Sequence, residues 1–386
     1  MTAQRDRTLM VMAGGTGGHV FPGIAVAEEL RDHHPGVEVV FVGGRRGLEA
    51  QAVPEARFRL RTLATSGFAR RRPWRWPWAA LVNTFGFFQA IWIVLSERPK
   101  AVLGTGGYVS GPVSVAARLL GCPLLLQEQN SIPGLTNRSL ARIANEVHLS
   151  FLEARRYFPK RDHLKVTGNP VRAYILSGER DQALREFKLD GSRPTLFIFG
   201  GSLGARRINA AAIDALRRLK GRFDVQCILQ TGREDHESVA AAVASEQLPA
   251  TVLPFVKKMH LAYAAADLVV CRAGAMTLAE IAVCGRPSIL IPYPYAAHDH
   301  QRVNAANLAD RGAAVMIDEN DLTGERLAQE IAHLLADRQQ LSRMSANARL
   351  FARPDAAARI ARSLVSWAEG HQGREATEEP VEEGQS

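Results

Sequence analysis

Short apolar runs alternate with helical patterns along nearly the whole chain, and this alternation is typical of parallel β-sheets covered by helices. In the first half, strands are predicted at residues 9–13, 37–42, 101–104 and 124–127. In the second half, strands are predicted at residues 195–199, 225–229, 251–253, 268–271, 288–291 and 314–317. Between the halves, Gly168-Asn169-Pro170 interrupts the pattern. We therefore expect an α/β fold of two doubly wound parallel-sheet domains with a boundary near residue 172.

Length and composition agree with this organisation. The 386 residues exceed one ordinary domain core and suit two. With 46% hydrophobic and 23% charged residues, the chain has the composition of a soluble globular protein. The first apolar stretch is broken by glycine too soon for a secretory signal, so we expect a cytoplasmic protein. The four cysteines show no C-x-x-C pairing and no metal-ligand spacing, so neither disulfides nor structural zinc is expected.

The charge is unevenly distributed along the chain. The net charge is +9, but residues 371–386 contain five Glu and one Arg, so the remainder carries +13. The acidic segment has almost no apolar residues and is predicted to be a disordered tail. A basic body is typical of proteins that bind nucleic acid, anionic lipid or a phosphorylated substrate.

Three glycine-rich segments each follow a predicted strand: "AGGTGGHVFP" at 13–22, "VLGTGGYVSGP" at 102–112 and "LFIFGGSLGARRIN" at 196–209. Backbone N–H groups at such strand-to-helix junctions suit an anion or a sugar. The first segment departs from the dinucleotide-binding pattern, since Val20 occupies the third glycine position and Gly43-Gly44-Arg45-Arg46 follows the second strand, where an acidic ribose ligand is expected. NAD binding is therefore disfavoured, and a glycine turn without a ligand is the plain alternative.

Two side chains near these segments can carry chemistry. His19 closes the first glycine segment, where an imidazole can act as a general base. Its structural alternative is a histidine that caps its own helix turn. Glu280 lies early in a predicted helix of the second half, where a carboxylate can accept hydrogen bonds from both ribose hydroxyls. Its alternative is a solvated acid favoured by the helix dipole.

The segment "AAHDHQRVNA" gathers polar side chains: His298, Asp299, His300, Gln301 and Asn304. Metal binding is one interpretation, but Gln301 and Asn304 lie three residues apart on one helical face and suit sugar hydroxyls better. No Asp-x-Asp pair occurs to hold a divalent ion with a nucleotide sugar, so no metal site is expected. Helix dipoles, backbone N–H groups and Arg172 or Ser202 are expected to hold a diphosphate.

A basic and aromatic segment lies in the first half. Seven arginines and no acid occur from Arg57 to Arg75, followed by an apolar helix predicted at 79–95. Tryptophans at 74, 76 and 78 join them, and Phe85, Phe88 and Trp92 share one helical face. This combination predicts contact with an anionic membrane surface, whereas the helix is short for a bilayer span. A buried core helix is the alternative, and no nucleic-acid recognition motif accompanies the arginines.

Seven motifs occur in the order found in the MurG family of N-acetylglucosaminyltransferases, which the chain resembles from about residue 9 to residue 367. The motifs are "GGTGGHVFPGIAVAEEL", "GTGGYVSGP", "QEQNSIPGLTNR", "GNPVR", "FGGSLGA", "CRAGAMTLAEI" and "HDHQRVNA". The resemblance implies the GT-B fold and an inverting, metal-independent transfer without a cofactor. Residues 1–172 would face the acceptor and the membrane, with a helix at about 355–369 packing back on them. Residues 173–354 would bind the UDP-sugar donor.

The resemblance also implies roles for individual residues. Val256 would sit by the uracil, Glu280 would hold the ribose, and Ser202 and Arg172 would lie near the nucleotide. The segment that would wrap the diphosphate and ribose is Ala275, Met276, Thr277, Leu278, Ala279 and Glu280. Gln301 and Asn304 would read the sugar, and Thr16, Gly17, Gly18 and Asn130 would reach the donor from the first domain. His19 and Glu128 are the two candidates for the general base.

The implied reaction joins N-acetylglucosamine, taken from UDP-N-acetylglucosamine, to undecaprenyl-diphosphoryl-N-acetylmuramoyl-pentapeptide in peptidoglycan synthesis, a step on which cell shape and division depend. The implied location is the cytoplasmic face of the inner membrane, where other cell-wall synthesis proteins are candidate partners and nucleic acid is not. Two positions depart from the family pattern: Gln127 stands where histidine is more frequent, and His300-Gln301 replaces a pair of glutamines. The rival functions are another GT-B transferase or a nucleotide-sugar epimerase, and a nonenzymatic nucleotide-binding or membrane-adaptor protein.

Overall fold

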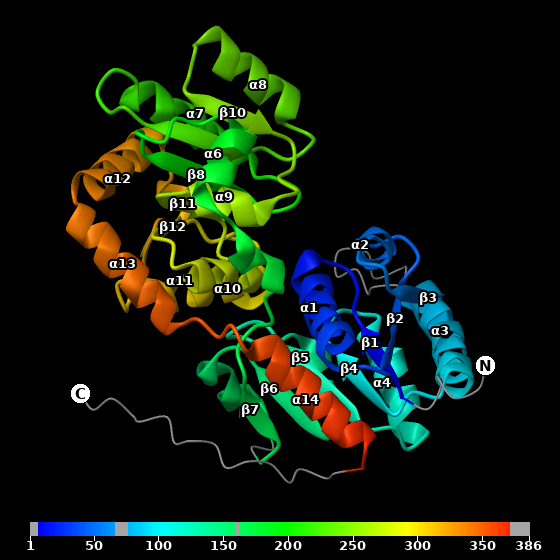
Figure 1. Cartoon of the computed structure of the whole chain (residues 1–386). Coiled ribbons are helices and arrows are strands. Elements are labelled where there is room, and N and C mark those ends of the chain that lie inside the picture. The colour runs from blue at the N-terminus through cyan, green and yellow to red at the C-terminus, as the bar shows by residue number, and fades with distance from the viewer. Residues whose placement is uncertain (1–6, 66–75, 160–161, 371–386) are drawn as a thin grey trace.

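The computed structural model describes residues 7–65, 76–159 and 162–370, which form two α/β lobes (Figure 1). Each lobe contains one sheet in which every strand pair is parallel. The apolar strand runs are buried on both faces, because helices cover both sides of a doubly wound sheet. None of the helices in the described ranges is long and apolar enough to cross a bilayer.

The first sheet has seven strands in the order β3-β2-β1-β4-β5-β6-β7. The strands are β1 (Thr8–Met12), β2 (Glu38–Gly44), β3 (Arg59–Leu63), β4 (Ala101–Gly104), β5 (Leu124–Glu128), β6 (Glu146–Leu149) and β7 (Leu164–Val166). The helices between them are α1 (Gly17–His33), α2 (Glu49–Glu55), α3 (Trp76–Glu97), α4 (Ser110–Leu119) and α5 (Leu135–Leu140), with a 3-10 turn at Leu152–Tyr157.

The second sheet has six strands in the order β10-β9-β8-β11-β12-β13. The strands are β8 (Thr195–Phe199), β9 (Gln226–Gln230), β10 (Ala250–Leu253), β11 (Leu268–Cys271), β12 (Ser288–Leu290) and β13 (Ala314–Met316). The helices are α6 (Arg180–Phe187), α7 (Arg206–Leu219), α8 (His236–Ser245), α9 (Met259–Ala265), α10 (Ala275–Cys284), α11 (His300–Ala309), α12 (Gly324–Ala336), α13 (Arg338–Leu350) and α14 (Ala356–Ala368).

All ten predicted strands are present, and three further strands were not predicted. β3 alternates arginine with apolar residues at one edge of the first sheet, and β7 is only three residues long at the other edge. β6 carries Glu146 and His148 inside the sheet, so its sequence lacks an apolar run. The apolar criterion therefore failed for strands that are short or that carry charged side chains at the edge of the sheet or inside it.

The polar residues of β6 anchor the last helix. His148 Nε2 lies 2.8 Å and Lys165 Nζ 3.3 Å from the carboxylate of Glu146, and the indole of Trp367 on α14 donates to it at 3.2 Å. Burial raises the pKa of Glu146, but the hydrogen bond and charge of His148 and the charge of Lys165 outweigh it and lower the pKa to about 2. The carboxylate therefore stays charged and holds α14 against the first sheet.

Helix α14 follows the second sheet in sequence but packs on the first (Figure 1). Ile360, Ala361 and Leu364 are buried in the same core cluster as strand residues of β1 and β4. The chain thus crosses between the lobes twice, near Gly168 and near Arg353. Gly168 has φ +89°, and a Cβ there would lie 2.4 Å from that of Arg353, so glycine is required where the crossings touch.

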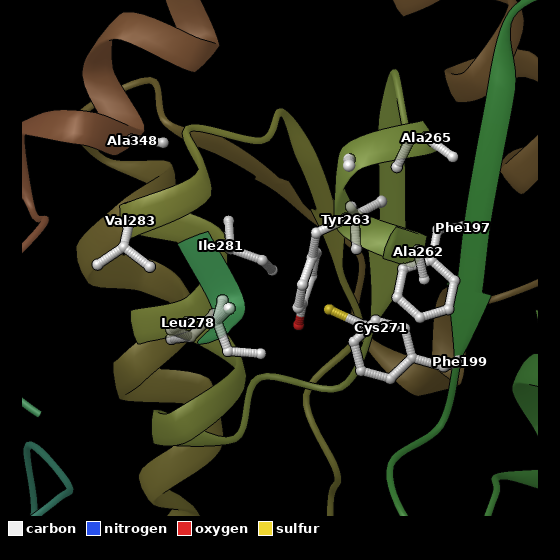
Figure 2. Close-up of a cluster of buried hydrophobic side chains, with 14 of the residues drawn as sticks. Phe197, Phe199, Ala262, Tyr263, Ala265, Cys271, Leu278, Ile281, Val283 and Ala348 are labelled. Carbon is white, nitrogen blue, oxygen red and sulfur yellow. The ribbon is translucent and has the colours of Figure 1, made fainter. Parts of the chain in front are cut away.

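The core of the second lobe is built around Tyr263 (Figure 2). Its ring makes edge contacts with Phe197 and Phe199 at 5.6 and 6.3 Å between centroids, while Ile281 and Leu278 of α10 lie on its other side (Figure 2). Tyr263 is fully buried, and its hydroxyl reaches a polar partner described below. The core therefore fixes α10 relative to β8 and β11.

Helix α3 has one buried and one exposed apolar face. Ala90, Ile93 and Val94 are buried, whereas Phe85, Phe88 and Trp92 are about 60% exposed, so the interpretation of a wholly buried helix is wrong.

Two of the seven arginines of residues 57–75, for which contact with an anionic membrane is predicted, pair with an acid while their side chains stay about half exposed. Arg59 and Arg61 form ion pairs with Glu97 at 3.2 and 2.6 Å, joining β3 to α3. Arg70, Arg71, Arg72, Arg75 and Trp74 lie outside the described residues.

Candidate functional site

The candidate site lies where strands of both sheets end and helices begin. Helix α1 starts directly after Thr16, and α10 starts directly after Gly274, and neither residue caps its helix through a side chain in the described structure. No side chain therefore occupies the first N–H groups of either helix, which suits a ligand, although the N–H of His19 in α1 bonds to the carbonyl of Thr16 at 3.0 Å. The two helices also contact each other across the lobes.

The first glycine loop, which follows β1, is held in place by a buried carboxylate. The buried carboxylate of Glu49 accepts hydrogen bonds from the N–H groups of Gly15, at 3.1 Å, and Gly44, at 2.9 Å. The second glycine loop packs against the first, since a Cβ on Gly107 would lie 2.3 Å from the carbonyl oxygen of Gly14. The two loops therefore form one rigid backbone surface. Sequence reasoning missed Glu49, because an acid in a first helical turn ordinarily faces solvent.

His19 projects from the first turn of α1 toward the second glycine loop. Its Nδ1 lies 3.0 Å from the carbonyl oxygen of Thr105 and 3.1 Å from Oε1 of Gln129. Both partners are acceptors, so Nδ1 carries the proton and Nε2 is the basic nitrogen. Burial lowers the pKa of His19, which outweighs the opposing effect of these hydrogen bonds. A neutral imidazole with a free Nε2 is suited to accept a proton.

Glu128, the other candidate base, is engaged by its own loop. One carboxylate oxygen accepts from the N–H of Asn130 at 3.0 Å, and the other accepts from Asn137 at 2.9 Å and from the N–H of Gly134 at 3.2 Å. Burial raises the pKa of Glu128, and these hydrogen bonds oppose the rise. The contacts give Glu128 a clear role in shaping the loop that follows β5.

Asn130 and Asn304 meet between the lobes. Asn304 is fully buried; its side-chain oxygen accepts from the N–H of Ser131 at 3.1 Å, and its Nδ2 donates to Asn130 Oδ1 at 3.4 Å. Asn307, one turn further along α11, donates to the hydroxyl of Ser131 at 3.1 Å. These hydrogen bonds join the loop after β5 to α11 of the other lobe. Asn304, predicted as a sugar contact, is thus engaged by protein partners in this structure.

Glu280 lies in the second turn of α10. Tyr263 donates a hydrogen bond to its Oε2 at 2.9 Å, and no other hydrogen bond to Glu280 occurs in the described ranges. Burial raises the pKa of Glu280 to about 7, against the lowering effects of Tyr263 and the positive charge of Arg172. The carboxylate is therefore held in place with acceptor capacity to spare.

Arg172 lies between the lobes near Glu280. Its guanidinium is 4.8 Å from the ring centroid of Phe21 on α1 and donates to the hydroxyl of Tyr174 at 2.7 Å. Its positive charge also lowers the pKa of Glu28, although burial raises that pKa more strongly. The rings of Phe21 and Tyr174 thus hold the guanidinium of Arg172, and with it a positive charge, at the boundary between the lobes.

Ser202 and Val256 are joined by a residue that sequence reasoning missed. Gln230, at the end of β9, donates to the carbonyl of Gly201 at 2.9 Å and accepts from the N–H of Val256 at 2.8 Å. Ser202 is exposed in this loop, whereas the side chain of Val256 is buried in the core. The side chain of Val256 is therefore closed to a ligand, and its N–H is already bonded to Gln230. A polar residue at the end of a strand was the signal for Gln230.

The remaining predicted residues divide between loop and core. Thr16 and Gly18 are exposed and Gly17 is half-buried; Met276, Thr277 and Ala279 are half-buried, whereas Ala275 and Leu278 are buried. Figure 2 shows Leu278 among the core side chains, so its side chain is part of the core and not of the site.

Gln301 accepts from the N–H of Tyr293 at 3.0 Å, and the charge of the neighbouring His300 lowers the pKa of His19, so α11 approaches the first glycine loop. Within the described residues, no group of three or more His, Cys, Asp or Glu side chains could hold a metal ion.

Comparisons with known proteins match this architecture. Residues 9–149 match the glycosyltransferase family 28 N-terminal domain, and residues 195–360 match the family 28 C-terminal domain. A Chlorobaculum parvum protein named UDP-N-acetylglucosamine–N-acetylmuramyl-(pentapeptide) pyrophosphoryl-undecaprenol N-acetylglucosamine transferase is 45% identical, over 93% of this chain and 98% of its own. A Myxococcus xanthus protein of the same name is 43% identical over 97% of each chain.

The crystal structure of the Acinetobacter baumannii MurG superimposes with a TM-score of 0.73 at 33% identity, covering 93% of this chain and 99% of that one. A UDP-N-acetylglucosamine 2-epimerase superimposes with a TM-score of 0.69 at 14% identity, over 96% of this chain and 98% of that one, and shares the fold alone. The two parallel-sheet lobes are the GT-B fold. The chain belongs to glycosyltransferase family 28 and, within it, to the MurG family.

Proposed function

We propose that this glycosyltransferase moves N-acetylglucosamine from UDP-N-acetylglucosamine to the 4-hydroxyl of undecaprenyl-diphosphoryl-N-acetylmuramoyl-pentapeptide. Relatives 41–45% identical over at least nine-tenths of the chain bear this activity in their names. The structural observation that carries the proposal is the contact across the lobes between α1, which carries the neutral imidazole of His19 in its first turn, and α10, whose first turn has no side-chain cap. The first group can activate a hydroxyl and the second can bind a diphosphate.

Donor binding is assigned to the second lobe. The N–H groups of Ala275, Met276 and Thr277 face the diphosphate, and the helix dipole of α10 favours its negative charge. Glu280 accepts from the ribose hydroxyls, while the backbone beside Val256 and Gly201, braced by Gln230, holds the uracil. Gln301, whose side-chain oxygen is fixed by Tyr293, offers its amide nitrogen to the sugar.

The chemistry is a single displacement. The acceptor hydroxyl gives its proton to Nε2 of His19, and its oxygen bonds to the anomeric carbon of the donor. The bond from that carbon to the phosphate oxygen breaks, and its electron pair leaves with UDP, so the configuration inverts. Negative charge grows on the diphosphate as the bond breaks, so the N–H groups of α10 stabilise the transition state more than the ground state.

The transfer is tested with radiolabelled UDP-N-acetylglucosamine and a lipid-linked muramoyl acceptor, with EDTA and with magnesium. We expect labelled lipid product at comparable rates in both conditions, because helix dipoles and N–H groups replace a metal in the proposed site. Product that forms only with magnesium would contradict the metal-free mechanism. A parallel incubation of the donor alone distinguishes the epimerase alternative, which would convert the sugar without an acceptor.

The assignment of the base predicts different results for two variants. His19→Ala should lower kcat by about a hundredfold or more while UDP affinity stays within about twofold, as expected for loss of a general base. Glu128→Gln should keep kcat within about tenfold, because an amide of the same shape retains part of the loop hydrogen bonding. Steady-state kinetics and calorimetry with UDP measure both effects. The reverse pattern would make Glu128 the base.

The assignment of Glu280 predicts a pH-dependent donor affinity. Glu280→Ala should raise the Kd for UDP-N-acetylglucosamine by tenfold or more, since charged hydrogen bonds are worth about 1.5–3 kcal/mol. Binding needs the carboxylate, whose pKa is about 7, so affinity should be greatest well above pH 7 and decline as the pH falls through 7. Calorimetry between pH 6 and 8 measures this dependence, which Glu280→Gln should remove. Glu234→Ala, at an exposed position, is the control and should leave the Kd unchanged. An unchanged Kd in Glu280→Ala would place the nucleotide elsewhere.

We also propose that the first lobe docks on an anionic membrane, where a lipid-linked acceptor must remain. The exposed face of α3 presents a continuous apolar stripe at helical spacing: Trp78, Leu81, Phe85, Phe88, Trp92 and Leu95, each 54–63% exposed. Helix α4 packs beside α3 and adds the exposed Val115 and Leu119. An exposed apolar area of this extent supports an interface with lipid.

Basic side chains lie in the same helical layer. Arg138, Arg142 and Arg156 line an open cavity of about 340 Å³ with Tyr157, and no carboxylate forms an ion pair with these three arginines in the described ranges. Helix α5, which carries Arg138, contacts α4. The cavity therefore adds, next to α4, positive charge suited to phosphate headgroups.

Vesicle sedimentation tests the docking surface. Replacing Phe85, Phe88 and Trp92 together by Gln should weaken binding to anionic vesicles by at least tenfold, because less apolar surface is buried. Replacing Arg138 and Arg142 by Gln should weaken it by about thirtyfold at low salt, at about 1 kcal/mol per charge, and less at high salt. Both variants should retain transfer to a short-chain soluble acceptor, and Leu350→Gln on α13 is the exposed control. Unchanged sedimentation would place the docking surface elsewhere.

A further inference from the structure

A row of buried amides runs from the first chain crossing to the proposed base. Asn169, Gln127 and Gln129 are each at least nine-tenths buried, and consecutive members are hydrogen-bonded to one another. We propose that Gln127 and Gln129 act as positioning residues that hold His19 in the tautomer protonated at Nδ1, with Nε2 free for the acceptor hydroxyl. This inference rests on the proposed role of His19 and goes beyond it by naming the groups that select its reactive nitrogen.

The first step concerns the contact with His19. Nδ1 faces two oxygen atoms, the carbonyl of Thr105 and the side-chain Oε1 of Gln129. The hydroxyl of Thr105 also donates to the backbone carbonyl of His19 at 2.7 Å, so the same residue fixes the backbone of the histidine. An Nδ1 without a proton would face two lone pairs and lose both hydrogen bonds. The protonated form of Nδ1 is therefore strongly preferred.

The second step concerns the orientation of the Gln129 amide. Its Nε2 donates to the carbonyl of Thr105 at 2.7 Å and to the carbonyl of Gln127 at 3.3 Å, and it also contacts Oε1 of Gln127. All three partners are acceptors. Rotating the amide by 180° would place its oxygen against them and turn its NH₂ toward His19. The surroundings of Gln129 therefore fix which of its atoms His19 meets.

The third step concerns Gln127, whose oxygen is one of those acceptors. Its own Nε2 donates to the hydroxyl of Ser150 at 3.1 Å and to Oδ1 of Asn169 at 3.3 Å. These contacts hold Nε2 on the far side and leave Oε1 toward Gln129. Orientation is thus passed from Asn169 through two amides to the imidazole, and none of these amides changes charge with pH. A carboxylate in the position of Gln129 would also orient His19, but its negative charge would raise the pKa of the imidazole. The amides orient His19 without this effect.

The charged surroundings of His19 are consistent with this role. The electrostatic effect of His300, which lies on the other lobe, lowers the pKa of His19. Burial acts in the same direction, whereas the hydrogen bonds to Gln129 and Thr105 raise the pKa. The imidazole therefore stays neutral at neutral pH. A neutral imidazole carries its proton on either Nδ1 or Nε2. The amides of Gln129 and Gln127 select Nδ1.

The direct test is ¹⁵N NMR of the full-length protein labelled at histidine, with the His19 signals identified by their loss in His19→Ala. The wild type should show His19 as the Nδ1-protonated tautomer, and observation of the Nε2-protonated form would overturn the proposal whether or not any variant folds. Gln129→Leu should shift the signals toward a tautomer mixture and lower kcat at least tenfold with the donor KM within about twofold.

A double-mutant cycle tests the relay itself. Gln127→Leu should lower kcat less than Gln129→Leu, and the double variant should be no slower than Gln129→Leu alone, because Gln127 acts only through Gln129. Gln226→Leu is the matched control, since Gln226 is also a buried, multiply bonded glutamine but lies in the second sheet. It should reduce stability without altering the His19 signals.

The outcomes separate the two proposals. Additive effects of Gln127→Leu and Gln129→Leu, or unchanged His19 signals in a folded Gln129→Leu, would overturn the relay. Full activity in His19→Ala would overturn the proposed base instead, and the tautomer measured by NMR would still stand as a separate result.

Discussion

All strands within each sheet run parallel, so every segment that follows a strand leaves from the same edge of its sheet. This direction places the glycine loops after β1, β4 and β8 and the start of α10 at carboxyl-terminal edges, where N–H groups of new helices point away from the sheet. Two such edges meet only because the chain crosses between the lobes twice. The packing of α14 on the first sheet and the pairing of Glu146 with His148 and Lys165 secure the second crossing. The start of α10 on one lobe is thereby held near α1 and the first glycine loop on the other.

The sequence predicts the backbone of this arrangement better than its polar contacts. Apolar runs locate ten strands, and glycine loops locate His19, because both signals are local in the chain. β6 was not predicted because the polar residues Glu146 and His148 lie inside the sheet, 2.8 Å apart, and β3 was not predicted because its apolar residues alternate with arginines that pair with Glu97. No local sequence pattern shows that a polar residue will pair with a residue far away in the chain.

The same limit applies to the site. Glu280 and Glu128 were predicted from motifs, but their surroundings were not. Tyr263 lies 17 residues before Glu280, and Gln129 lies 110 residues after His19. Glu49 reaches the N–H of Gly15 over 34 residues. Each of these groups is bound through a tertiary contact, so only the folded chain shows that the Glu128 carboxylate shapes a loop while His19 keeps a free nitrogen.

Asn304 and Gln301 illustrate how burial divides two residues that the sequence treats alike. Both lie on α11 and both were predicted to contact the sugar. The amide of Asn304 is occupied by the N–H of Ser131 and by Asn130, so a sugar hydroxyl would have to displace a buried hydrogen bond between the lobes. The oxygen of Gln301 is held by Tyr293, and its nitrogen makes no hydrogen bond in the described ranges, so it can donate without such a cost. We infer that Gln301 donates a hydrogen bond to the sugar, whereas Asn304 fixes the distance between α11 and the loop after β5. A residue that sets this distance also sets the separation between donor and base, and that separation governs how readily the acceptor oxygen reaches the anomeric carbon.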